Sequence, residues 1–334
     1  MLEWAGDLKI RGVDLFLDSR RRRTRCFVSH AHSDHVANHQ QMIATPATIS
    51  LASHRLRRRG SSLPIDYNEP IGLDDRTRIE LLSAGHVLGS AMIHVTSDDG
   101  SLLYTGDFAL RDSPILPPAE PKHADVLVME STFGRPMYRF PPWRDVASQL
   151  IDIVRESLRD RCQPIVFGYS LGKAQMAMRI LADGGFVVRA HPDVAAIARI
   201  YESHGVSLGD WRELNETDFH GRGALDLDER GVIVAPPQVS RAPFVKQFDR
   251  VCRIMLTGWA IERGANFRYG VDYALPLSDH ADFDQLLEMI ERVGPSKIFA
   301  CHGNADFVDI LRSRGLNAFP AKPKHQMELF EPWA

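Results

Sequence analysis

The segment HAHSDH, residues 30–35, decides how the rest of this sequence is interpreted. It follows an apolar run that is typical of a strand. In an extended segment, residues two apart point the same way, so His30 and His32 can bind one metal ion together. Asp34 and His35 can turn toward a second ion close by. Imidazole and carboxylate groups suit zinc or manganese, and four of them within six residues predict a metal site rather than a polar surface loop.

Three further residues fit the same plan. His86 in SAGH, Asp107 in TGD and His302 in CHG each follow an apolar run, and a glycine precedes both His86 and Asp107. A single histidine at a strand end is more often structural than a ligand. Because all three residues occur together with the segment 30–35, a role as ligands is favoured over a structural one. We therefore expect all three to be metal ligands.

The pattern of apolar residues changes along the chain. Short apolar runs such as 91–97 and 125–131 predict strands in the first part, whereas helical and strand patterns alternate after residue 138. This alternation is typical of a parallel sheet covered by helices. Because ligand-type residues lie before and after it, the middle block is expected to be an insertion. The predicted domains are a first part at 1–138, an inserted domain at 139–272 and a C-terminal part at 273–334.

Composition narrows the class of protein. The 334 residues are 44% hydrophobic and 25% charged, which is ordinary for a globular protein. No apolar run is long enough for a membrane span, and the first residues lack a secretion-signal pattern, so we expect a cytoplasmic protein without a membrane partner. The four cysteines are scattered without CxxC spacing, which argues against a zinc-thiolate site and against disulfides.

The net charge of −3 means that any attraction for nucleic acid must be local. Two basic clusters could supply it, although such a cluster taken alone is more often a solvated face than a binding patch. The first comprises Arg20, Arg21, Arg22, Arg23 and Arg25, and the second comprises Arg55, Arg57, Arg58 and Arg59.

These motifs, with Asp18 in LFLDS, resemble the metallo-β-lactamase superfamily. Glu130 in MESTFG, His280 in LSDHADF and His302 in CHGNADF resemble the three later motifs of the β-CASP nucleases. The stretches TFGRPMYRFPP (132–142) and FGYSLGKAQ (167–175) are most similar to those of bacterial DNA-ligase-associated exonucleases. The resemblance covers nearly the whole chain. It implies an α/β fold, an αββα metallo-β-lactamase sandwich with an inserted parallel α/β β-CASP domain.

The resemblance also implies two divalent metal ions, zinc and/or manganese, that share the carboxylate of Asp107. Asp18 would support the loop without being a ligand. The first ion would be held by His30, His32, His86 and Asp107, and the second by Asp34, His35, Asp107 and His302. Two neighbouring metal ions make a hydroxide available near neutral pH. Because Asp34 would help to hold one of these ions, it is counted with the catalytic residues as well as with the ligands.

Two further roles concern the proton and the phosphate. His280 is the expected proton donor to the leaving oxygen, and Glu130 is the expected partner that orients it, a duty that Asp279 and Asp282 could share. Ser170 and Lys173 lie at a predicted helix start, a position that suits phosphate. A solvated lysine on a helix explains Lys173 equally well.

The predicted function is a two-metal-dependent nuclease that hydrolyses phosphodiester bonds, with a DNA exonuclease of DNA repair as the favoured form. An RNA-processing β-CASP nuclease is the main alternative, and a small-molecule metallo-hydrolase or a metal-free binding module are weaker ones. The expected partners are nucleic acid, with DNA favoured over RNA, and a DNA ligase or helicase of the same repair pathway.

Overall fold

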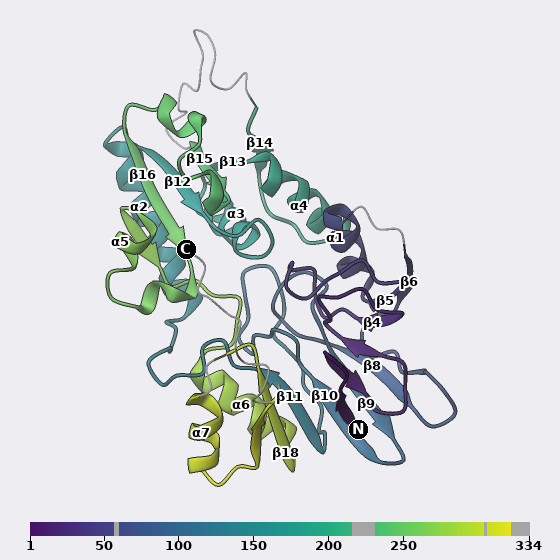
Figure 1. Ribbon diagram of the computed structural model, residues 1–334. Coiled ribbons are helices and arrows are strands. Elements are labelled where there is room, and N and C mark those ends of the chain that lie inside the picture. The colour runs from purple at the N-terminus through teal and green to yellow at the C-terminus, as the bar shows by residue number, and fades with distance from the viewer. Residues whose placement is uncertain (57–59, 216–230, 304–305, 322–334) are drawn as a thin grey trace. The chain divides into compact units, whose positions relative to one another are not determined.

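The computed structural model describes residues 1–56, 60–215, 231–303 and 306–321 (Figure 1). The chain forms two compact units. Unit 1 comprises Met1–Asp112, Pro117–Tyr138 and His280–Ala334, and unit 2 comprises Ser113–Leu116 and Arg139–Asp279. The chain therefore passes into unit 2 after Tyr138 and returns at His280, and the assignment of residues 273–279 to the C-terminal domain stays a prediction.

Unit 1 contains two mixed sheets. The first has the order β1-β2-β3-β4-β5-β6 and the second β19-β18-β11-β10-β9-β8-β7. The strands of the first sheet are β1 (Leu2–Trp4), β2 (Leu8–Ile10), β3 (Phe16–Leu17), β4 (Arg25–Phe27), β5 (Gln41–Ala44) and β6 (Ser61–Pro64). Those of the second are β7 (Ile71–Gly72), β8 (Arg78–Ser83), β9 (Ala91–Ser97), β10 (Gly100–Tyr104), β11 (Val126–Glu130), β18 (Lys297–Cys301) and β19 (Ala318–Pro320).

The layers of unit 1 follow from the alternation of side chains along each strand. In β10, Leu102 and Tyr104 enter an apolar core that also contains Phe27 of the first sheet. Leu103 points the other way, into a second core with residues of α6 (Phe283–Val293) and α7 (Asp306–Ser313). Helix α1 (Pro46–Leu56) contacts β5 and β6 of the first sheet. The predicted αββα sandwich is confirmed.

Unit 2 is a sheet of six parallel strands in the order β14-β13-β15-β12-β16-β17. Most residues of β12, β13 and β15 are buried, as expected for a parallel sheet with both faces covered. The strands are β12 (Gln163–Phe167), β13 (Val187–Ala190), β14 (Trp211–Glu213), β15 (Gly231–Ala235), β16 (Val251–Leu256) and β17 (Tyr273–Leu275). The helices and 3-10 turns are α2 (Trp143–Arg159), α3 (Lys173–Asp183), α4 (Pro192–Ser203), α5 (Ala265–Tyr269), η2 (Pro237–Val239), η3 (Pro243–Gln247) and η4 (Gly258–Ile261). The predicted inserted parallel α/β domain is confirmed.

Two simpler expectations can be compared with the fold. All four cysteines are free thiols, which agrees with the absence of a disulfide framework. Among the helices that the structure describes, none is both long and apolar enough to cross a bilayer.

Candidate metal centre

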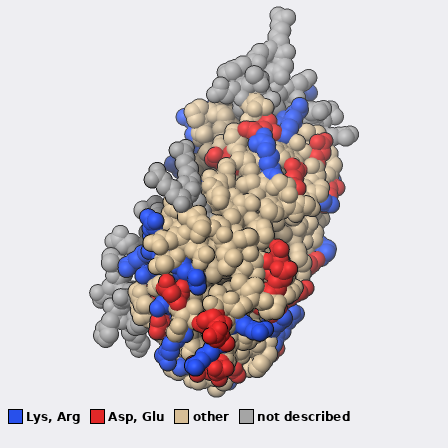
Figure 2. All heavy atoms as spheres, turned by 90° about the vertical axis from the view of Figure 1, so that its right-hand side faces the viewer, with Lys and Arg blue, Asp and Glu red and all other residues tan. Residues whose placement is uncertain are grey.

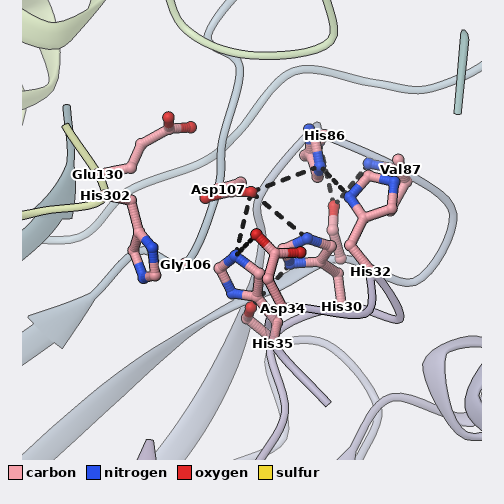
Figure 3. Close-up of polar contacts among 12 residues, drawn as sticks. His30, His32, Asp34, His35, His86, Val87, Gly106, Asp107, Glu130 and His302 are labelled. Carbon is pink, nitrogen blue, oxygen red and sulfur yellow. Dashed lines mark hydrogen bonds and ion pairs between the residues drawn. The ribbon is translucent and has the colours of Figure 1, made fainter. Parts of the chain in front are cut away.

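The predicted ligands lie in loops that follow strands of unit 1 (Figure 3). The segment 30–35 follows β4, His86 follows β8, Asp107 follows β10 and His302 follows β18. Figure 3 shows Asp107 in the middle, with the histidines on several sides of it. Segments from both sheets therefore contribute to one polar centre.

One set of four residues is tightly grouped. His30, His32, His86 and Asp107 each offer a ligand atom, and these atoms lie within 4.8 Å of one another. The Asp107 Oδ2 atom is 3.4 Å from His30 Nε2 and 3.9 Å from His86 Nε2. His86 Nε2 is also 3.1 Å from His32 Nδ1. These four residues are those predicted to hold the first ion.

The residues predicted for the second ion meet around His35. Its Nε2 atom lies 3.3 Å from Oδ2 of Asp107 and 3.7 Å from Oδ2 of Asp34. The rings of His35 and His302 have centroids 4.8 Å apart. Asp34 is less enclosed than the others, because 56% of its side chain is exposed. Asp107 thus touches both sets through the same oxygen, while Asp34 and His302 lie at the margin.

Glycine is required directly before two of these residues. Gly85 precedes His86 with a φ of 68°, and Gly106 precedes Asp107 with a φ of 54°, both in the left-handed region. A Cβ atom on Gly106 would lie 2.5 Å from the Cβ atom of Ser29. The close approach of this backbone to the 30–35 segment therefore depends on the missing side chain.

Asp18 supports the centre from behind. Its Oδ1 atom accepts a hydrogen bond from the Ser29 backbone N–H at 2.7 Å. Its Oδ2 atom accepts from the Ser29 hydroxyl at 2.5 Å and the Tyr104 hydroxyl at 2.8 Å, and it lies 2.8 Å from His35 Nδ1. This arrangement agrees with the supporting role that the family resemblance implies for Asp18.

Ser29 connects this support to His30. The single hydroxyl proton of Ser29 is donated to Asp18, so its oxygen can accept a hydrogen bond from Nδ1–H of His30, 2.9 Å away. Nε2 of His30 is then left with a free lone pair directed at the centre. Sequence analysis missed Ser29 and Tyr104, although Ser29 directly precedes His30 and Tyr104 lies within the YTGD motif.

The pKa values of the buried groups in the centre are shifted in opposite directions. Burial and the positive charge of His35 lower the pKa of His30 well below its ordinary range. Burial opposes a charged His35, yet the carboxylates of Asp107 and Asp18 outweigh it and hold the His35 pKa well above the ordinary range. Burial also opposes a charged Asp107, but His35 holds the Asp107 pKa well below the ordinary range.

Two buried atoms of the predicted ligands lack a hydrogen-bond partner among the residues that the structure describes. They are Nε2 of His30 and Oδ1 of Asp107. A buried polar atom without a partner is unfavourable unless a ligand satisfies it. Nitrogen and oxygen donors of this kind suit zinc or manganese, so the residues present fit a divalent metal ion.

A histidine–carboxylate pair adjoins the centre. His280 Nδ1 lies 3.2 Å from both carboxylate oxygens of Glu130 and 4.0 Å from Asp107 Oδ2. Glu130 is fully buried, and its Oε1 atom also accepts a hydrogen bond from the Phe108 backbone N–H at 2.9 Å. Glu130 is therefore rigidly placed to orient the His280 ring.

The two aspartates that could share this duty have other partners. Asp282 caps helix α6 by accepting from the Gln285 backbone N–H, and it forms an ion pair with Arg111. Asp279 pairs with Lys173 within unit 2.

Ser170 and Lys173, predicted to bind phosphate, belong to unit 2. Lys173 begins helix α3 but is buried, with its ammonium on Asp279 and 5.3 Å from the ring centre of Tyr169. The carbonyl of Ser170 accepts from Gln175 Nε2. Lys173 is thus a paired, buried lysine rather than a solvated one, and phosphate binding by the two residues stays a prediction.

Known proteins similar to this chain identify its family. Residues 265–319 match the family described as the Zn-dependent metallo-hydrolase RNA specificity domain. The chain is 38% identical to the Probable DNA ligase of Opitutus terrae over 318 residues. The matched region makes up 94% of this chain and 30% of that protein. The chain belongs to the β-CASP nuclease family of the metallo-β-lactamase superfamily.

Further β-CASP relatives act in different processes, according to their names. The DNA cross-link repair protein SNM1 of Arabidopsis thaliana is 26% identical over 84% of this chain and 61% of its own length. RNase aCSPSF2 of Saccharolobus solfataricus is 27% identical over 84% of this chain and 68% of its own length. The chain thus spans about a third to two thirds of these relatives.

A crystal structure of a protein of unknown function from Enterococcus faecalis V583 shares the fold, with a TM-score of 0.59 at 15% identity. The similarity covers 83% of this chain and 75% of that one.

Proposed function

We propose that this β-CASP chain is a two-metal-dependent nuclease that hydrolyses phosphodiester bonds, and that it acts on DNA as an exonuclease in DNA repair. One observation carries the proposal. Oδ2 of Asp107 is shared between the tightly grouped set of His30, His32 and His86 and the second set around His35. A carboxylate that faces two groups of imidazoles is suited to two neighbouring cations.

The metal ions proposed are zinc and/or manganese. His30, His32, His86 and Asp107 would hold the first, and Asp34, His35, Asp107 and His302 would hold the second. When bound, the two ions supply an acidified water and electrostatic stabilisation of the phosphoryl group.

The chain's own residues would handle the proton. The Nδ1–H of His280 donates to Glu130, which fixes the orientation of the ring. The opposite nitrogen, Nε2, is then available to give a proton to the oxygen that leaves phosphorus. His280 also lies beside Asp107, so the proton donor adjoins the proposed ligands.

The preference for DNA is supported by the named relatives. The relative that covers 94% of this chain is called a Probable DNA ligase, and this chain corresponds to 30% of it. The names SNM1, a DNA cross-link repair protein, and Apollo, a 5' exonuclease of Gallus gallus, point the same way. We further propose that a DNA ligase acts on the same substrates as this chain, because a ligase-named protein contains a similar segment.

RNA is the second candidate substrate. It is favoured by the match of residues 265–319 to an RNA specificity domain and by the similarity to RNase aCSPSF2. Discrimination between the two polymers usually depends on contacts to the 2′-hydroxyl.

A gel assay tests both substrates. It uses end-labelled single- and double-stranded DNA and RNA, with 5′-hydroxyl or 5′-phosphate ends, in manganese or zinc. We expect DNA to be shortened from an end, and His32→Ala to be inactive. Faster cleavage of RNA would overturn the DNA assignment, and a metal-loaded sample that leaves every polymer intact would overturn the nuclease proposal.

A further inference from the structure

Arg55 holds the backbone of the predicted ligand loop. It lies in the last turn of α1, and its Nη1 atom donates a hydrogen bond of 2.8 Å to the carbonyl of Ala31. Ala31 stands between His30 and His32, so the guanidinium is fixed beside the loop that carries the predicted ligands. The residue is nevertheless exposed to solvent.

Most of the hydrogen-bonding capacity of Arg55 is unused. A guanidinium has five N–H donors, and the bond to Ala31 uses one of them. Within the described ranges, no carboxylate lies within 4 Å of Arg55, although Asp34 is near enough to interact with it electrostatically. The remaining donors are therefore open to a ligand that approaches the centre.

The charge of Arg55 requires an explanation at this position. A permanent cation beside a site for two divalent cations is repelled by them, unless an anion comes between. Of the proposed ligands, only Asp34 and Asp107 are anionic, and together they offset half of the charge of two such ions. A negatively charged group supplied from outside the chain would relieve this imbalance.

Neither the net charge nor the face drawn in Figure 2 indicates a general attraction for polyanions. The chain has a net charge of −3. On the face drawn in Figure 2, basic and acidic side chains are intermixed rather than separated into large patches of one sign. A few well-placed cations must therefore supply the attraction. Arg57, Arg58 and Arg59 of the same predicted basic cluster lie outside the described residues.

We propose that Arg55 is a substrate-positioning residue that binds a phosphate of the polynucleotide backbone next to the bond that is cut. This inference rests on the proposed nuclease function and names a group that recognises the substrate. One edge of the guanidinium is held by Ala31, and the remaining N–H groups bind the oxygens of the phosphate. The planar fork of an arginine suits such oxygens better than the point charge of a lysine.

The test compares three variants in a His32→Ala background, which prevents cleavage. Arg55→Gln removes the charge but can still donate to Ala31, Arg55→Lys keeps the charge, and Arg76→Gln is the matched control. Arg76 is an arginine of unit 1 whose side chain is 83% exposed and is paired with Asp98. Binding of a short labelled single-stranded oligodeoxynucleotide is measured by fluorescence anisotropy over a series of KCl concentrations.

We expect Arg55→Gln to weaken binding by about tenfold. The plot of log Kd against log salt should become shallower by about 0.7, the value for one phosphate contact on a single strand. Arg55→Lys should restore the salt dependence but only part of the affinity, and Arg76→Gln should change neither. With His32 present, Arg55→Gln should raise KM and leave both kcat and the metal content nearly unchanged.

An unchanged salt dependence in Arg55→Gln would overturn the proposal, because a residue that only supports the loop does not release counterions. A loss of metal and of kcat without a change in KM would overturn it as well. If the chain cuts no polymer, the nuclease function fails, while the binding series still decides whether Arg55 contacts a phosphate.

Discussion

Nδ1 of His35 lies 2.8 Å from Oδ2 of Asp18, a carboxylate oxygen that also accepts hydrogen bonds from Ser29 and Tyr104. The acceptor positions of Asp18 are therefore occupied by groups of the protein itself. Asp18 acts on the centre through the residues that it contacts. It orients His35 directly and His30 through Ser29. A single carboxylate thus fixes which nitrogen of two predicted ligands faces the metal.

The first prediction concerns Asp18→Asn. The carboxylate of Asp18 now faces four hydrogen-bond donors, and the asparagine side chain would replace one of its oxygens with an N–H donor. The tautomers of His30 and His35 would then no longer be enforced. We expect metal affinity to fall by about 10- to 100-fold, as measured by competition with a chelator. Asp7→Asn is the control, because Asp7 pairs with Ser19 and Arg23 and contacts none of the predicted ligands. Equal affinities in the two variants would contradict the role assigned to Asp18.

The second prediction uses two glycines with similar backbones. Gly12 has a φ of 81°, and a Cβ atom added to it would have no neighbour within 4 Å, whereas a Cβ atom on Gly106 would collide with Ser29. Gly12→Ala should reduce the free energy of unfolding by about 1 kcal/mol, from backbone strain alone. Gly106→Ala should reduce it by a further ~1–3 kcal/mol, because of the clash. Urea denaturation of the metal-free protein measures both, and equal losses would show that the approach to Ser29 is unimportant.

The third prediction separates proton transfer from metal binding. His280→Ala should lower kcat by about 10²- to 10⁴-fold, the usual contribution of a general acid. The metal content should stay unchanged, because His280 is not among the proposed ligands. His94→Ala in β9 is the control, since that imidazole contacts the carbonyl of His123 instead. A full loss of metal from the His280 variant would place His280 among the ligands.

The fourth prediction concerns metal removal. A ligand that binds only the folded chain stabilises it by about 2.7 kcal/mol when its concentration is 100 times its Kd. Zinc or manganese at that excess should therefore raise the Tm of the chelator-treated protein and restore cleavage. His32→Ala should show a much smaller rise, since His32 belongs to the tightly grouped set. A Tm independent of metal would argue that the centre binds none.

The features that were predicted best depend on the pattern of apolar residues within a short segment. The strand at 91–97 has the predicted bounds. Long periodic apolar runs leave few alternatives for such segments. The convergence of Asp107 and His302 was likewise predictable, because both follow strands of one sheet, whereas His30 follows a strand of the other sheet.

Other features depend on tertiary contacts that no local pattern reveals. The run 12–18 contains only the two-residue strand β3, since Gly12 and Val13 turn the chain back toward β2. Helix α1 was not predicted, because its threonine, isoleucine and serine residues are weak helix formers and its stability comes from packing on β5 and β6. Lys173 is buried and pairs with Asp279, which lies more than one hundred positions away in the sequence.

Strand β18, which leads to His302, pairs in parallel with β11, although unit 2 is inserted between them in the chain. During synthesis on the ribosome, His30 emerges first and His302 emerges nearly three hundred residues later. A partly made chain consequently cannot complete the centre. The proposed hydrolase would thereby stay inactive until the segment that contains His302 has left the ribosome.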